Sequence, residues 1–209
     1  MIRAVISDFG GVLTTPLIES FRAYRDESGV SFERLGEAMA RVAGRRGGEH
    51  PLFELERGRM TEAEFLEAIE GELDGDVHLS SLRETYFANL HPNARMIGFM
   101  RDLRDRGLRM ALLTNNVREW EPHWRAKLPD IDAIFDVVVD SAFVGMRKPE
   151  HGIYELTLER LGDGIAAGHC VFVDDTDINC DAAEELGMRA VRFRDDEQAI
   201  AELEALVRG

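Results

Sequence analysis

The sequence predicts an α/β fold, with a doubly wound parallel sheet and an inserted block of helices. Two observations on the 209-residue chain predict this fold. From residue 92 onward, short apolar runs alternate with helical patterns, which is typical of a parallel sheet with right-handed crossovers and helices on both faces. Between residues 14 and 92, no segment has a convincing strand pattern, so this block is expected to be helical.

The first strand is expected within the stretch from Ile2 to Leu13, IRAVISDFGGVL. Its apolar run is rich in β-branched residues and stops at Asp8. Gly10 and Gly11 follow, and glycine lets the backbone turn sharply and lets a ligand approach it closely. Because open α/β sheets bind ligands at the carboxyl ends of their strands, Asp8 lies where a ligand is expected. An Asp before glycines is, by itself, more often the start of a turn.

The block that follows is predicted to contain helices over residues 17–26, 32–42, 61–73 and 79–90. Thr61 and Glu64 have the spacing of a capping box at the start of the third helix. Between the second and third helices, residues 41–51 read as a glycine-rich loop that carries three arginines in an otherwise acidic chain.

Beyond residue 92 the elements alternate. Strands are predicted over residues 108–113, 135–139, 170–173 and 188–193, and helices over residues 94–106, 117–128, 150–161, 179–186 and 195–207. The helix over 117–128 tolerates Pro122 only because that residue lies near its start.

Composition limits the classes of partner. The formal net charge of -15 argues against a nucleic-acid or anionic-membrane surface, either of which needs a broad basic face. A small anionic substrate stays possible, because one metal ion and a lysine invert the local field. The two cysteines suggest no disulfide framework, and no apolar run approaches the ~20 residues that span a bilayer. We expect a cytoplasmic monomer or homodimer that acts on a small molecule.

Polar residues end the predicted strands, and the ends of parallel strands share one edge of a sheet. The residues in question are Asp8, Thr114 with Asn115, Lys148, and Asp174 with Asp175. Three carboxylates in one cleft repel one another without a cation, and Mg²⁺ prefers oxygen ligands of this kind. A carboxylate beside such an ion and a lysine can act as a nucleophile and form an acyl phosphate. Each motif alone also fits a turn, a helix cap or a solvated loop, and their combination in this order favours a site.

Four segments carry a family resemblance: DFGGVLT (8–14), LLTNN (112–116), RKPEHGIYELTLERLG (147–162) and VFVDDTDIN (171–179). Together they resemble the four motifs of the haloacid dehalogenase-like hydrolase superfamily. The resemblance implies a Rossmann-like core, Mg²⁺ as cofactor, and Asp8 as a nucleophile assisted by Thr114 and Lys148. It also implies that Asp8, the backbone carbonyl of Gly10 and Asp175 bind the metal, with Asp174 alongside.

The helical block resembles the small α-helical cap of subfamily I, as in the segment LERGRMTEAEF (55–65). More narrowly, the chain is similar to the branch that contains the phosphatase domain of soluble epoxide hydrolases. We therefore expect a core of residues 1–14 and 92–209 and a cap of residues 15–91. Asn115, Arg45 and Arg46 are predicted substrate-binding residues, since arginines can clamp a carboxylate or phosphate. The alternative for the arginines is a solvated loop.

One position departs from the family pattern. Phosphatases of the family usually carry a second Asp two residues after the nucleophile, as the general acid and base, and this chain has Gly10 there. Loss of a positioned acid or base typically lowers rates by about 10²–10⁴-fold. Three functions stay open: a phosphatase acting on a small phosphorylated metabolite, a 2-haloacid dehalogenase that uses the same Asp8, and a catalytically weak binding or regulatory protein.

Overall fold

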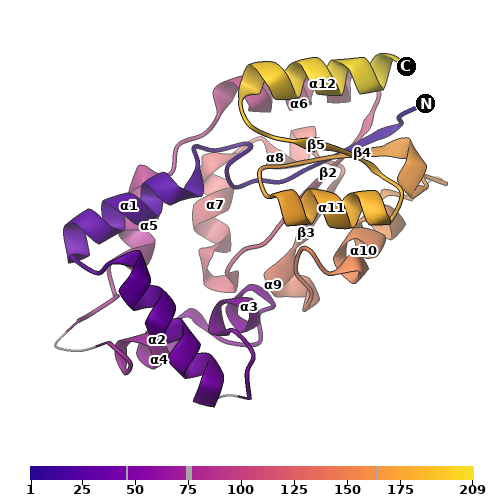
Figure 1. Cartoon of the computed structure of the whole chain (residues 1–209). Coiled ribbons are helices and arrows are strands. Elements are labelled where there is room, and N and C mark those ends of the chain that lie inside the picture. The colour runs from indigo at the N-terminus through magenta and orange to yellow at the C-terminus, as the bar shows by residue number, and fades with distance from the viewer. Residues whose placement is uncertain (46, 74–76, 163) are drawn as a thin grey trace.

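The computed structural model describes residues 1–45, 47–73, 77–162 and 164–209 (Figure 1). Its five-stranded sheet has the order β3-β2-β1-β4-β5, and every neighbouring pair is parallel. The strands are β1 (Ala4–Ser7), β2 (Arg109–Thr114), β3 (Val137–Asp140), β4 (Cys170–Asp174) and β5 (Arg189–Arg192). The predicted α/β class and the parallel sheet are confirmed.

Helices cover both faces of this sheet, and the buried side chains form two separate cores, one on each face. In Figure 1, α6 (Ala94–Asp105) and α12 (Asp196–Arg208) lie above the sheet, and α10 (His151–Leu161) and α11 (Asp177–Glu185) lie below it. Strand β1 divides its side chains between them: Val5 packs in the upper core and Ile6 in the lower one. Burial on both faces explains why β1 and β4 read as continuous apolar runs.

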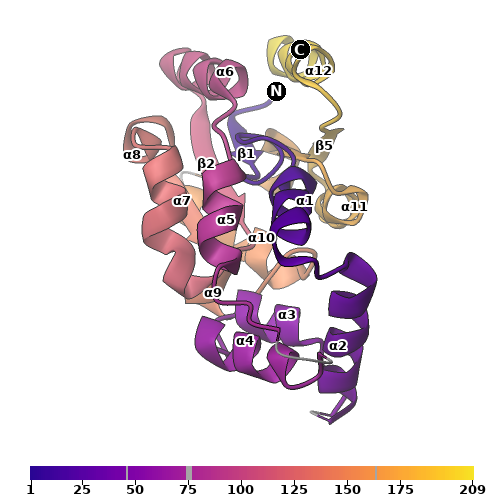
Figure 2. The same cartoon turned by 90° about the vertical axis from the view of Figure 1, so that its left-hand side faces the viewer.

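The inserted block contains α1 (Leu17–Ser28), α2 (Phe32–Arg45), α3 (Pro51–Glu56), α4 (Glu62–Glu70) and α5 (Leu82–Asn89). No strand occurs in its described residues, and the capping box at the start of α4 forms as predicted. In Figure 2, the pair α1 and α5 connects the sheet to the group α2, α3 and α4. The chain segments that lead into and out of the block run side by side, with a bridge between Thr14 and Pro92.

Several predicted boundaries were wrong. The helix expected over residues 117–128 is divided into a 3₁₀ turn, Arg118–Trp120, and α7 (Glu121–Lys127). Pro122 lacks an N–H group, so it fits the first turn of α7 and cannot continue a helix that began earlier. Helix α2 extends to Arg45 and α3 begins at Pro51, so the loop expected over 41–51 is shorter than predicted.

Short elements complete the fold. They are α8 (Ile131–Ile134), α9 (Ser141–Val144) and the 3₁₀ turn Ala167–His169. Each has four residues or fewer, which is too short for a periodic pattern to predict. Among the described helices, none combines the length and the apolar character that crossing a bilayer requires.

Candidate active site

Three carboxylates meet at the carboxyl edge of the sheet. Asp8 follows β1, Asp174 ends β4, and Asp175 comes next. Each offers one oxygen within 4.8 Å of the others, and Asp8 and Asp174 are buried. The predicted convergence of strand ends therefore brings together residues that are more than 160 positions apart in the sequence.

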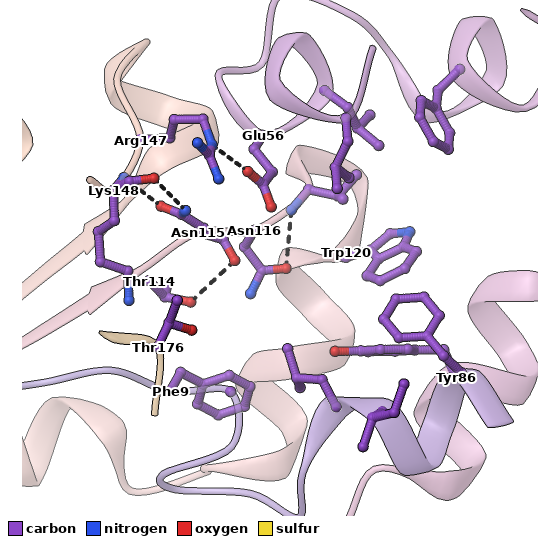
Figure 3. Close-up of a pocket in the computed structure, with 18 of the residues that line it drawn as sticks. Phe9, Glu56, Tyr86, Thr114, Asn115, Asn116, Trp120, Arg147, Lys148 and Thr176 are labelled. Atoms are coloured by element: carbon purple, nitrogen blue, oxygen red, sulfur yellow. Dashed lines mark hydrogen bonds and ion pairs between the residues drawn. The ribbon is translucent and has the colours of Figure 1, made fainter. Parts of the chain in front are cut away.

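Lys148 lies between two of these carboxylates and is 2% exposed. Its Nζ donates to Asp8 Oδ1 and to Asp174 Oδ2, both at 2.6 Å. The amide of Asn115 holds the lysine backbone, because Nδ2 donates to the carbonyl of Lys148 at 3.0 Å and Oδ1 accepts from its N–H at 2.8 Å (Figure 3). Asn115 was predicted to bind substrate. Its side chain positions the backbone of Lys148, a contact that sequence reasoning missed.

Both carboxylate oxygens of Asp174 accept hydrogen bonds from other residues of the protein. Besides Lys148, it accepts from the backbone N–H of Thr176 at 2.8 Å and from Asn179 Nδ2 at 3.1 Å. Asn179 was quoted in the fourth motif without a role, although its position on the first turn of α11 points it back at the strand end. Of the two adjacent carboxylates, Asp175 has fewer protein partners and is better placed to bind a cation.

Carboxylate side chains outnumber positively charged ones at this edge of the sheet. Burial raises the pKa of Asp8 to about 7; Lys148 opposes this rise, and the carboxylates of Asp174 and Asp175 add to it. Burial, followed by the charge of Asp174, likewise raises the pKa of Asp175. One ammonium group faces three carboxylates, so a divalent cation fits the donor set by charge and by ligand type.

Gly11 leaves the room that this arrangement needs. Its φ of +83° lies in the left-handed region, and a Cβ there would overlap the Asp175 carboxylate, with Cγ only 2.8 Å away. Gly10 differs, because the three atoms nearest to a Cβ there all belong to the side chain of Leu17, with Cδ1 at 2.9 Å. The two glycines that predicted a turn therefore differ in what they allow. Gly11 allows the left-handed backbone and leaves room for Asp175, whereas Gly10 leaves room for Leu17.

Gly11→Ala is expected to destabilise the fold by about 1–3 kcal/mol through backbone strain. It should also displace Asp175 and weaken Mg²⁺ binding, measured by titration calorimetry beside denaturant unfolding. Gly29→Ala is the matched control, since Gly29 has a φ of +71° and nothing within 4 Å of the added Cβ. Equal Mg²⁺ affinity in the two variants would contradict this role for Gly11.

A cavity of about 690 Å³ opens from the carboxylate cluster. The predicted site residues that line it are Asp8, Gly10, Thr114, Asn115, Lys148 and Asp175. Arg45 is not among the lining residues; its guanidinium pairs with Glu72 and its side chain is 73% exposed. Arg46 lies outside the described residues.

The inserted block supplies an apolar wall opposite the cluster. Leu17 and Phe21 of α1, Met39 of α2, Phe65 of α4 and Tyr86 of α5 all line the cavity. Sequence reasoning missed these residues, because an apolar helix face has the same pattern whether it packs in a core or borders a cavity.

Glu56 at the end of α3 and Arg57, the residue after it, form two ion pairs with the segment that carries Lys148. Arg147 Nε donates to Glu56 at 2.5 Å, and Arg57 Nη2 donates to Glu150 at 2.6 Å. The members of these pairs are 91 and 93 residues apart, and no local sequence signal predicts them. Block and core are therefore connected directly beside the site.

Comparison with known proteins gives relatives over nearly the whole chain. Mouse acyl-CoA dehydrogenase family member 10 is 30% identical over 98% of this chain, which spans only 19% of that protein. The sesquiterpene phosphatase astK of Aspergillus oryzae is 28% identical over 98% of this chain and 96% of its own length. Phosphatase MT3486 of Mycobacterium tuberculosis is 29% identical over 90% of this chain and 86% of its own.

Solved structures share the fold. A predicted HAD-like family hydrolase from Porphyromonas gingivalis has a TM-score of 0.76 at 22% identity, and covers 100% of this chain and 99% of its own. The HAD family enzyme bt-2542 of Bacteroides thetaiotaomicron, solved with magnesium and inorganic phosphate, has a TM-score of 0.70 at 22% identity, over 93% and 95%. The family model for haloacid dehalogenase-like hydrolases matches residues 2–187 of this chain. The resemblance of the four motifs is thereby confirmed, and the chain belongs to the haloacid dehalogenase-like hydrolases.

Proposed function

We propose that this hydrolase is a Mg²⁺-dependent phosphatase that cleaves the phosphate monoester of an apolar alcohol through a phospho-Asp8 intermediate. The observation that carries the proposal is the Lys148 ammonium between Asp8 and Asp174, with Asp8 and Lys148 lining a cavity that has apolar walls. The phosphatases among the relatives, and the magnesium and phosphate in the bt-2542 structure, support the reaction class.

In this reaction Asp8 is the nucleophile. Lys148 binds Oδ1 and favours the ionised carboxylate, which leaves Oδ2 to attack phosphorus as the bond to the alcohol oxygen breaks. Lys148 and the hydroxyl of Thr114 would donate to the phosphoryl oxygens. Asp8, the carbonyl of Gly10 and Asp175 would hold Mg²⁺, which neutralises phosphoryl charge when bound. Water then hydrolyses the acyl phosphate.

The apolar character of the substrate's alcohol is inferred from the charged groups that line the cavity. Apart from the cluster residues, those that line it are Glu56, Glu62 and Arg147. Glu56 pairs with Arg147, and Glu62 accepts from Arg83 at 2.6 Å. Among the described residues that line the cavity, no unpaired cation is left to bind a second anionic group, and the apolar walls favour an apolar alcohol. The relative astK, named a sesquiterpene phosphatase, is in keeping with such a substrate.

We also propose that residues 15–91 form the cap domain and that residues 1–14 and 92–209 form the core. The bridge from Thr14 to Pro92 lies at these boundaries, and residues of α1, α2, α4 and α5 line the cavity above the cluster. A cap in this position excludes water from the reacting phosphate.

Phosphate release from n-alkyl phosphates tests the function. Each added methylene is expected to raise kcat/KM about fourfold until the cavity is filled, from about 0.8 kcal/mol per buried methylene. Glycerol and sugar phosphates of similar size should be poor substrates, and a chelator should stop turnover. Preference for the sugar phosphates would contradict the apolar assignment. Halide release from 2-haloacids without Mg²⁺ would instead establish the dehalogenase.

A further inference from the structure

The position of the missing acid is filled by an apolar side chain. Leu17 of α1 occupies the space into which a side chain at Gly10 would extend. An acid is therefore absent at this position, and a side chain there would require Leu17 to move. A proton for the departing alcohol has to come from another group that lines the cavity.

Three side chains outside the cluster could supply a proton: Glu56, Glu62 and Tyr86. Glu56 is held by Arg147. Glu62 accepts from Arg83 and, at 2.7 Å, from Trp120 Nε1. The hydroxyl of Tyr86 has no hydrogen bond with any residue that the structure describes. Glu62 thus has both carboxylate oxygens engaged and Glu56 has one, whereas the hydroxyl of Tyr86 is committed to no protein partner among the described residues.

Aromatic neighbours fix the Tyr86 ring. Phe21, Phe87 and Trp120 pack around it with ring centroids 4.9–5.2 Å from its own. Figure 3 shows the hydroxyl end pointing away from Trp120 and into the cavity. Burial, with the Asp8 carboxylate as a second cause, raises the pKa of Tyr86, so the hydroxyl keeps its proton at neutral pH. A rigid donor thus projects from an apolar wall into the cavity that Asp8 also lines.

We propose that the Tyr86 hydroxyl donates a hydrogen bond, and then its proton, to the oxygen of the departing alcohol. This role rests on the proposed phosphatase function. As the bond from Asp8 to phosphorus forms, the P–O bond to the alcohol breaks and its electron pair takes the Tyr86 proton. An alkoxide is about as basic as hydroxide, so it accepts this proton readily. The tyrosinate then removes a proton from the water that attacks phospho-Asp8, which restores Tyr86 and Asp8.

Tyr86→Phe, which keeps the ring and its packing, tests the role through the leaving group. With an n-alkyl phosphate, kcat/KM is expected to fall by about 10²-fold or more, as for other general acids. With p-nitrophenyl phosphate, whose leaving group needs no proton, the change should stay within about threefold. A purely structural role for the hydroxyl would lower both activities in the same proportion.

Tyr24→Phe is the matched control. Tyr24 is 1% exposed and does not line the cavity, and its hydroxyl has no hydrogen-bond partner among the residues that the structure describes. Both substrates should be turned over at the wild-type rate by this variant. Equal losses on the two esters in Tyr86→Phe, or a selective loss on the alkyl ester in Glu56→Gln instead, would overturn the assignment. Wild-type protein that cleaves neither ester would overturn the phosphatase function itself, and the role of Tyr86 with it.

Discussion

Asp8→Asn is expected to lower kcat by on the order of 10⁴–10⁶-fold, the range observed when a nucleophile or its essential partner is removed. Asparagine matches aspartate in size and can still accept from Lys148 Nζ, so the geometry of the cluster is retained. The amide cannot form the acyl phosphate, and the reaction loses its first step. Phosphate release from the preferred alkyl phosphate, with saturating Mg²⁺, measures the effect.

The fold of this variant is expected to be as stable as the wild type without metal, or more so. Burial and the neighbouring Asp174 and Asp175 raise the pKa of Asp8, so its charge is unfavourable in the folded state. Removal of that charge relieves repulsion among three carboxylates. An unchanged or higher melting temperature would show that lost activity does not come from unfolding. Activity within tenfold of wild type would exclude Asp8 as the nucleophile.

Lys148→Met is expected to abolish activity and to destabilise the fold by about 3–5 kcal/mol, the cost of leaving buried charges without their partner. Methionine has a similar length and no charge. Asp8 and Asp174 would then face each other in a site where Lys148 is 2% exposed. Denaturant unfolding without metal gives the change in free energy, and added Mg²⁺ should restore part of it.

The chain has one other lysine, Lys127 at the end of α7, and this residue offers the control. Lys127→Met removes the same charge far from the carboxylates and should change stability by no more than about 0.5 kcal/mol. Comparable losses of stability in the two variants would show that net charge, rather than the buried pairs of Lys148, causes the effect.

The sequence by itself predicted the parallel sheet and which side chains gather at its carboxyl edge. Strands β1 and β4 are buried on both faces, so their apolar runs were recognisable without knowledge of their neighbours. Parallel strands place their carboxyl ends together, and the position of Asp8, Lys148 and Asp174 followed from that rule alone. A local pattern was sufficient for Asp8 and Asp174 because they stand at the ends of β1 and β4, whereas Lys148 lies in the loop between α9 and α10.

Only the tertiary structure decided what surrounds that chemistry. Arg45 pairs with Glu72 away from the cavity, whereas the unpredicted Tyr86 projects into it. The pair of Arg147 with Glu56 joins residues 91 positions apart. The physical reason is that a cavity is the space left between helix faces from distant parts of the chain. The sequence pattern of one helix shows which of its faces is apolar, but not whether that face borders a cavity. The sequence therefore indicates which reaction the strand ends support, and the packing of α1 to α5 decides what kind of molecule reaches them.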